Sequence, residues 1–282
     1  MRWRRGGVSA DVEDRRGSGF AGRGLKLGIG GTLVVGLLSM LLGTDLFAVI
    51  GGGSGVPTGG EQQGAPVSET PAERERVEFV SFVLDDLQQT WSGEFSRAGG
   101  DYQRAKLVLF RDVVDSACGT GQSATGPFYC PLDGKVYLDL GFFDELASRF
   151  GAAGEFAQAY VVAHEMGHHV QNLLGVSDKV RALQSRRPGE RNALSVRLEL
   201  QADCLAGVWA HSTRRRDLLE RGDVESALGA ASAIGDDRLQ RGAGRRVSPE
   251  TFTHGSSAER VEWFRRGLES GRADGCDTFG GS

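Results

Sequence analysis

The chain has 282 residues, enough for one sizeable domain or two small ones. Charged residues make up 25% of it and hydrophobic residues 39%, which is the composition of an ordinary globular protein. The net charge of -4 argues against nucleic acid as a partner, because nucleic-acid-binding domains carry a clear excess of basic residues.

The N-terminal part of the sequence predicts a membrane anchor. Residues 1–26 are polar and basic, residues 27–50 are mostly apolar, and residues 51–71 are rich in Gly, Ser, Pro and Gln. About 20 apolar residues suffice to cross a bilayer, so 27–50 is predicted to be one transmembrane helix. The positive-inside rule then places 1–26 in the cytoplasm, with 51–71 as a flexible linker and 72–282 as an extracytoplasmic domain. A cleavable signal peptide is the alternative, although its apolar region is usually shorter.

Residues 72–282 show strand patterns first and helical patterns later. Apolar residues recur at helical spacing over residues 73–97, and residues 105–114 are typical of a strand. An Asp-Gly pair at residues 133–134 separates two short segments with strand patterns, which predicts a hairpin. Beyond Phe142 the pattern is helical almost to the end. This order predicts an α+β domain with a small antiparallel sheet and a mainly helical remainder.

The four cysteines predict two disulfides. None of them forms a C-x-x-C pair, so neither a zinc ribbon nor a thioredoxin-like site is expected. An even number suits disulfides in a domain outside the cytoplasm. The favoured pairs are Cys118–Cys130, which would close a short local loop, and Cys204–Cys276, which would tie the C-terminus to a helix. Four buried free thiols are the alternative.

The His-Glu-Met-Gly-His segment at residues 164–168 carries the clearest chemistry. Residues 155–174 are predicted to form one helix, ended by Gly175, so that His164 and His168, four residues apart, project from one face. Two imidazoles at this spacing bind one Zn²⁺, and the glutamate beside the first is placed to take a proton from a water on the metal. Zinc makes such a water acidic near neutral pH, so Glu165 is predicted to be the general base and not a ligand.

A second apolar helix downstream contains two acids, Glu199 and Asp203, four residues apart on one face. Catalytic zinc keeps three protein ligands and one open position, so Glu199 is predicted to be the third ligand of one zinc ion per chain. Asp203 is predicted to accept a hydrogen bond from the far nitrogen of a liganding histidine. A solvated acidic stripe is the alternative, but acids inside an apolar helix fit it poorly.

These residues give the chain a family resemblance. The pattern His-Glu-x-x-His followed by Glu-x-x-x-Asp resembles the gluzincin metallopeptidases, and the whole chain is similar to a bacterial family of predicted neutral zinc metallopeptidases that are membrane-anchored at the N-terminus. The matching stretches are Met1-Arg-Trp-Arg-Arg-Gly-Gly7, Gly126-Pro-Phe-Tyr-Cys-Pro131, Ala163-His-Glu-Met-Gly-His-His-Val-Gln171, Arg197-Leu-Glu-Leu-Gln-Ala-Asp-Cys204 and Phe252-Thr-His-Gly-Ser-Ser257. The resemblance implies zinc and a gluzincin-like fold more firmly than it implies a substrate.

A hydrogen-bond donor opposite the base would stabilise the negative charge that develops on the carbonyl oxygen during peptide hydrolysis. His254 is the first candidate, because Thr253-His254 and the later Arg260 are similar to a segment of membrane-associated gluzincins that approaches the active site. A loop histidine that caps the following helix is its alternative role. Tyr160, one turn before His164, is the second candidate, with packing in the helix core as its alternative.

The resemblance also implies a substrate-binding strand. In gluzincins a sheet edge lies over the cleft, and residues 136–140 are expected to form such an edge, where an extended peptide pairs with the backbone. An ordinary core hairpin is the alternative for this segment.

The predicted function is therefore a membrane-anchored zinc endopeptidase that acts on a protein or peptide substrate outside the cytoplasm. A non-catalytic, zinc-stabilised scaffold in the membrane is the alternative, and it would normally have four protein ligands on the metal. An intramembrane protease is disfavoured because residues 164–168 lie well outside the apolar span. The substrate, the cleavage preference and the oligomeric state do not follow from the sequence.

Overall fold

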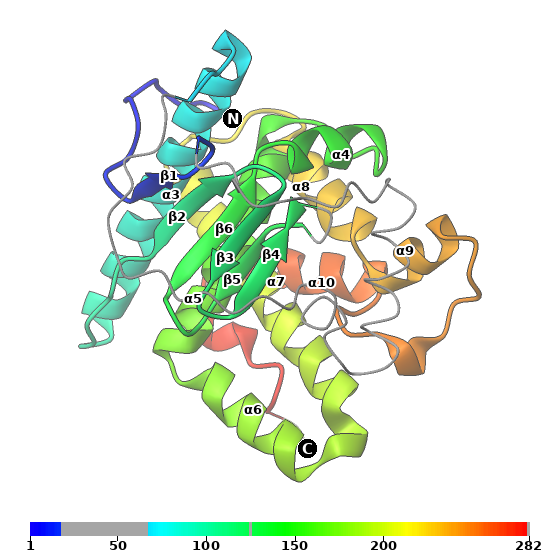
Figure 1. The fold of residues 1–282 in the computed structure, drawn as a ribbon. Coiled ribbons are helices and arrows are strands. Elements are labelled where there is room, and N and C mark those ends of the chain that lie inside the picture. Colours follow the sequence, from blue (N-terminus) through cyan, green and yellow to red (C-terminus); the bar gives the residue numbers. More distant parts are fainter. Residues whose placement is uncertain (18–66, 124–125, 281–282) are drawn as a thin grey trace, which may run out of the picture. The chain divides into compact units, whose positions relative to one another are not determined.

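A computed structural model describes residues 1–17, 67–123 and 126–280, in which one long helix separates the first strand from the other strands and the remaining helices follow (Figure 1). The described strands are β1 (Val12–Asp14), β2 (Lys106–Phe110), β3 (Val113–Ser116), β4 (Gly119–Gln122), β5 (Phe128–Cys130) and β6 (Lys135–Asp139). The described helices are α3 (Pro71–Arg97), α4 (Phe142–Ser148), α5 (Glu155–Leu173), α6 (Val176–Arg186), α7 (Arg191–Arg215), α8 (Asp223–Ala233), α9 (Asp236–Gly242) and α10 (Ser257–Ser270). This is the predicted α+β class, and it is mostly helical.

The main sheet is mixed, so the prediction of an antiparallel sheet is wrong. Its strand order is β1-β2-β6-β5, in which β2 pairs parallel with both β1 and β6, and only β5 and β6 pair antiparallel. Parallel neighbours need long connections, and here β1 comes from the N-terminus while the β3–β4 hairpin and β5 separate β2 from β6. The predicted turn at Gly134, with a φ of 69°, does join the antiparallel pair.

The predicted strand at residues 105–114 is two strands. Asp112 has a φ of 62° and turns the chain between β2 and β3. As a result β3 leaves the sheet and pairs with β4 in a separate hairpin. A positive φ is uncommon for a residue other than glycine, but aspartate tolerates it better than most, and no pattern of apolar residues would reveal the break.

The two faces of the main sheet belong to different cores. Leu107, Leu109 and Leu138 point to one face and pack in the large core with α3 and α5. Val108 and Tyr137, at the alternate positions, point to the other face, where they form a small core with Val114 of the β3–β4 hairpin and Cys130 of β5. The sheet therefore supports α5 on one side and the β3–β4 hairpin on the other.

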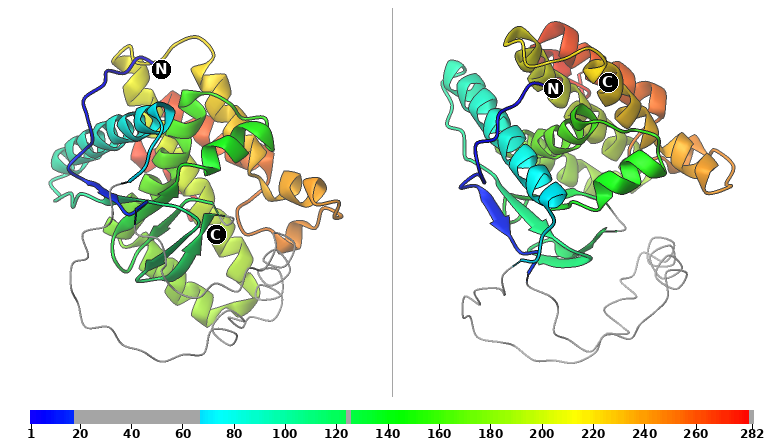
Figure 2. Two further views of the ribbon diagram at one scale, coloured as in Figure 1. Left: turned by 45° about the horizontal axis from the view of Figure 1, so that its top comes forward. Right: turned by 90° about the horizontal axis from the view of Figure 1, so that it is seen from above.

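Residues 1–17 are part of the same compact unit as residues 67–280. Figure 2 shows the N-terminal segment beside α3 before it enters the sheet as β1. Met1 is 6% exposed within the large core, and the ring of Trp3 lies 5.3 Å from that of Phe79 on α3. The predicted boundaries, with a separate segment before residue 27 and a domain that begins at residue 72, therefore differ from the structure.

The predicted anchor, residues 27–50, lies outside the described residues, as does most of the predicted linker 51–71. No helix in the described part of the chain is long and apolar enough to cross a membrane. A single crossing at 27–50 would place β1 and β2 on opposite sides of a membrane, although the two strands are paired in register.

Both favoured disulfides are present. Cys118 and Cys130 join the β3–β4 hairpin to β5, with their Cα atoms 5.7 Å apart. Cys204 and Cys276 join α7 to the C-terminal segment, with Cα atoms 5.5 Å apart. All four cysteines of the chain are paired, so the alternative of free thiols is excluded.

Candidate metal centre and active site

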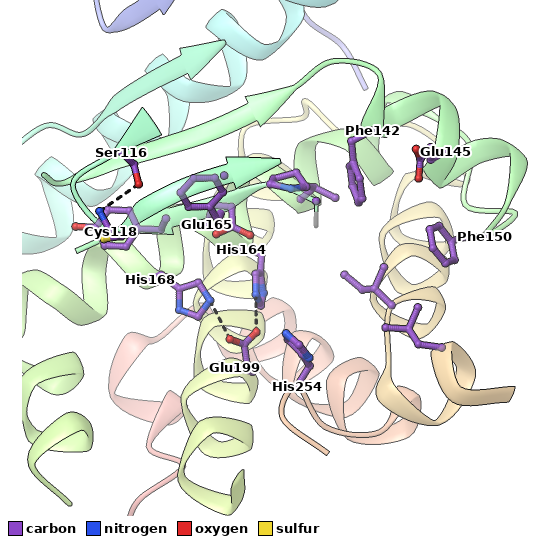
Figure 3. A pocket seen from close by; sticks show the side chains of 18 of the residues that line it. Ser116, Cys118, Phe142, Glu145, Phe150, His164, Glu165, His168, Glu199 and His254 are labelled. Carbon is purple, nitrogen blue, oxygen red and sulfur yellow. Dashed lines mark hydrogen bonds and ion pairs between the residues drawn. The ribbon is translucent and has the colours of Figure 1, made fainter. Parts of the chain in front are cut away.

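The three predicted ligands come together between α5 and α7, as Figure 3 shows. Oε2 of Glu199 lies 3.1 Å from Nε2 of His164, and Oε1 of Glu199 lies 3.4 Å from Nε2 of His168. One ligand atom from each residue lies within 4.8 Å of the others, so the group could hold a metal ion. The two histidines share a face of α5 because they are one turn apart, which is the local geometry that their spacing predicts.

The hydrogen-bond partners of the two imidazoles show that this donor set suits a cation. Nδ1 of His164 lies 2.8 Å from an oxygen of Asp203, and Nδ1 of His168 lies 2.8 Å from Oε1 of Gln171. A neutral imidazole carries one N–H, and here the oxygen acceptors hold it on Nδ1. Both Nε2 lone pairs then face the carboxylate of Glu199, which is also an electron-pair donor. Zinc fits such a convergence of two imidazole nitrogens and one carboxylate.

A buried ionic network holds the Nδ1 side of the His164 ring. The carboxylate of Asp203 is fully buried and accepts hydrogen bonds from Nε of Arg260 at 2.8 Å, from Nη2 of Arg260 at 3.0 Å and from the hydroxyl of Tyr160. Burial alone would raise the pKa of Asp203, but Arg260 and His164 lower it to about 2. The carboxylate is therefore ionised near neutral pH, and it orients the imidazole and makes it a better ligand.

Close helix contacts bring these side chains together. A Cβ atom on Gly167 would lie 2.9 Å from the carbonyl oxygen of Ala202, so the glycine next to His168 allows α5 and α7 to touch. A Cβ atom on Gly267 of α10 would lie 1.9 Å from the carbonyl oxygen of Cys204 on α7. The second contact lets the Arg260 side chain of α10 reach Asp203 of α7.

Glu165 lines the same cleft as the ligands but does not belong to the metal-binding group. It is 8% exposed, and burial is the largest cause of its raised pKa, against the lowering effect of His164 and His168. A carboxylate with a raised pKa is a better proton acceptor near neutral pH than an ordinary one. Its position and its pKa suit the predicted role of general base.

His254 lies across the cleft from Glu165, in the loop before α10 (Figure 3). One carboxylate oxygen of Asp236 accepts the backbone N–H groups of Thr253, His254 and Gly255 at 2.7, 2.7 and 3.1 Å. The other oxygen lies 3.2 Å from Nδ1 of His254. Asp236 thus holds both the loop and the ring, and the hydrogen bond to its carboxylate raises the pKa of His254, which favours the imidazolium, whose Nε2–H can donate a hydrogen bond. The cap of α10 is Ser256, so His254 does not have the alternative role of helix cap.

Tyr160 is placed differently. Its side chain is fully buried, it does not line the cleft, and its hydroxyl donates to Asp203. Of the two predicted oxyanion donors, only His254 therefore faces the space where a substrate would lie.

The cleft has a volume of about 690 Å³ and is bounded by the β3–β4 hairpin, the segment leading into β5, and α4, α5 and α9. The predicted edge strand at residues 136–140 is wrong, because β6 lies between β2 and β5 in the sheet. Residues 118–121 of the hairpin and 126–129 around β5 line the cleft instead.

Two residues of this site were given no role from the sequence, although Arg260 belongs to the segment that resembles the gluzincins. Arg260 lies on the face of α10 that also buries Phe264 and Leu268, so a basic residue at an apolar position is the signal that could have revealed it. Asp236 follows Gly235 at the start of a short helix, and its partner loop is 17 to 19 residues away, so no local pattern marks it.

Comparison with known proteins decides the family. The family described as "Putative neutral zinc metallopeptidase" matches residues 1–279. The chain belongs to this family. The uncharacterized protein YpfJ of Escherichia coli strain K12 is 48% identical over 291 residues that cover all of both chains. The uncharacterized proteins Rv2575 of Mycobacterium tuberculosis strain H37Rv and Mb2605 of Mycobacterium bovis are each 46% identical over 189 residues, or 63% of this chain and 63% of theirs. No solved structure matches the chain.

Membership of the neutral zinc metallopeptidase family implies zinc as the metal of the His164, His168 and Glu199 group. It also supports a general zinc-peptidase function for the chain. The names of these relatives assign no substrate.

Proposed function

We propose that this protein hydrolyses peptide bonds as a zinc-dependent endopeptidase, with His164, His168 and Glu199 as ligands. The observation that carries the proposal is the convergence of two Nε2 lone pairs and one carboxylate, with both Nδ1 atoms hydrogen-bonded to oxygen acceptors. Bound zinc supplies Lewis acidity, which polarises a peptide carbonyl and lowers the pKa of water toward neutrality.

The protein's own residues divide the remaining work. Glu165 takes the proton of the attacking water and passes it to the leaving amine, as its raised pKa favours. His254 donates from Nε2 to the carbonyl oxygen while negative charge develops there. Asp203 and Arg260 hold the first ligand in place. An extended substrate lies along residues 118–121 and 126–129, which line the cleft.

The alternative of a zinc-stabilised scaffold is less well supported. A structural zinc site normally fills all four positions with protein ligands. Within the described residues the metal-binding group has three members, and it opens into a cleft rather than into the core. An open position beside a buried carboxylate is the arrangement that catalysis needs.

The proposed place of action is outside the cytoplasm and at a membrane. The two disulfides support an oxidising compartment for the catalytic unit. The apolar composition of residues 27–50 supports attachment to a membrane.

The Glu165→Gln variant tests the proposal. We expect zinc content and melting temperature to match those of the wild type, while hydrolysis of an unfolded protein falls by about 10²–10⁴-fold. The Glu145→Gln variant, at the half-exposed rim of the same cleft, is the matched control and should retain activity. Equal activity of the Glu165→Gln variant and the wild type would overturn the proposed mechanism.

A further inference from the structure

The cleft has an apolar end next to the general base. Val161 is one turn before Glu165 on α5 and faces the same space. Four more apolar side chains line this end: Phe142, Phe150, Ile234 and Leu239. Figure 3 shows Phe142 and Phe150 on the same side of the ligands as His254, with Ser116 and Cys118 on the opposite side. A peptide that crosses the metal site therefore places one of its side chains among apolar groups.

A second cavity continues from this apolar end. Its volume is about 840 Å³, and it shares Arg149, Phe150 and Leu239 with the cleft. Arg238 and Arg241 also line it, and no acidic side chain does. A substrate chain that extends from the apolar end into the second cavity lies near three arginine side chains, those of Arg149, Arg238 and Arg241.

One of these arginines has no carboxylate partner. Arg149 pairs with Glu145, and Arg241 pairs with Asp237. Arg238 donates to Oγ of Ser232 at 3.2 Å and forms no ion pair with any residue that the structure describes. The second cavity thus offers an uncompensated positive charge, and a guanidinium group binds a carboxylate with two parallel hydrogen bonds.

We propose that the enzyme selects peptides with a large apolar side chain near the scissile bond and a carboxylate farther along the chain. The apolar side chain occupies the end lined by Val161, Ile234 and Leu239, and Arg238 binds the carboxylate in the second cavity. The carboxylate comes from a Glu or Asp side chain or from the C-terminus of the substrate. This inference rests on the proposed peptidase function.

A matched set of peptides tests the charge preference. Each peptide has one leucine and, beyond it, Glu, Gln or Lys, and each is made with a free or an amidated C-terminus. We expect the wild type to cleave the Glu peptide or the free C-terminus with a kcat/KM about five- to tenfold above the neutral peptide, a preference that added salt reduces. Arg238→Glu should reverse the order of Glu and Lys. Arg186→Glu, the same charge change on exposed α6, should leave it unchanged.

A second pair of variants tests the apolar end. Leu239→Asp should lower kcat/KM for the leucine peptide about tenfold or more, because burial of the substrate's leucine side chain against apolar groups contributes on that scale. Leu132→Asp, at a 65% exposed position in the β5–β6 turn, should have no effect. Equal kcat/KM values for all peptides, or an unchanged charge order in Arg238→Glu, would overturn the inference while leaving the peptidase function intact.

Equilibrium binding separates the two proposals. The Glu165→Gln variant should bind the uncleaved leucine and glutamate peptide about five- to tenfold more tightly than its lysine counterpart. If the wild type cleaves none of the peptides, the proposed function fails, and binding still decides the preference: discrimination by this variant supports it, and equal binding overturns it.

Contacts between residues 1–17 and the rest of the catalytic unit support a second inference, which does not depend on the first. The backbone N–H of Leu107 donates to the carbonyl of Asp11, and that of Arg15 donates to the carbonyl of Leu109, each at 2.8 Å. The side chain of Arg16 is 2% exposed and pairs with Glu69 at 2.9 Å. These contacts make β1 a strand of the catalytic unit. We infer that residues 1–17 and 67–280 occupy the same compartment, in contrast to the expectation of a cytoplasmic N-terminus with an extracytoplasmic domain.

Variants of the full chain with one added cysteine test this second inference. Arg4→Cys and Arg186→Cys place a thiol at exposed positions in the two parts, and the four native cysteines are paired in disulfides. A membrane-impermeant maleimide should label both variants in intact cells or neither, and both after lysis. Labelling of only one of them in intact cells would overturn the inference.

Discussion

The two sides of the cleft are held by different kinds of interaction. On the metal side, His164 is 5% exposed, and a fully buried Asp203 and a nearly buried Arg260 fix it. On the opposite side, the His254 side chain is 47% exposed, and Asp236 holds it mainly through the backbone of a loop. The metal side is thus built into the helix core, whereas the His254 side can adjust when a substrate enters.

This difference predicts which variants lose stability and which lose only activity. Removing one partner of a buried ion pair leaves an uncompensated charge and costs about 3–5 kcal/mol. Removing a half-exposed loop histidine leaves no buried charge behind. Variants that break the buried Asp203–Arg260 ion pair should therefore affect folding, zinc binding and activity together, and variants on the His254 side should affect activity alone.

The largest effect is expected for Asp203→Asn. The amide leaves the charge of Arg260 uncompensated, so the free energy of unfolding should fall by about 3–5 kcal/mol, and zinc affinity should fall about 10–100-fold. Urea denaturation and competition with a chelator measure the two quantities. Asp178→Asn, at a 77% exposed position on α6, is the matched control. An Asp203→Asn variant as stable as this control would contradict the assigned role of the network.

The next effect is expected for His254→Ala. Loss of one oxyanion donor typically lowers kcat about 10²–10³-fold, while zinc content and unfolding free energy should stay at wild-type values. Tyr160→Phe removes the other predicted donor and should leave kcat nearly unchanged, because its hydroxyl bonds Asp203 instead. A larger loss of kcat in Tyr160→Phe than in His254→Ala would exchange the two assignments.

A smaller effect, visible in the pH profile, is expected for Asp236→Asn. The hydrogen bond that His254 makes to the carboxylate of Asp236 is the largest cause that raises the pKa of His254 above its ordinary value of 6.5. A raised pKa keeps the imidazolium present at higher pH, so kcat should fall as pH rises through that pKa. Without the charge of Asp236 this fall should move to lower pH. An unchanged alkaline limb would show that His254 does not act as the charged donor.

The same contrast explains what could be predicted from the sequence. The ligand set follows from spacing within helices, because residues four apart share a face whatever the rest of the fold does. Asp236, by comparison, acts on a loop far along the chain, and the parallel pairing of β1 with β2 joins the N-terminus to a strand about 95 residues later. Contacts of this kind leave no local periodicity, so the mixed sheet and the position of residues 1–17 became clear only in the structure.

The proposed zinc ligands are His164, His168 and Glu199, and metal analysis of the purified full chain measures whether they hold the ion. The protein should be prepared without added metal or affinity tags that bind metal. We expect about one zinc per chain in the wild type and in His254→Ala, and almost none in His168→Ala or Glu199→Ala. A wild type without zinc, or a Glu199→Ala variant with undiminished zinc, would contradict this assignment.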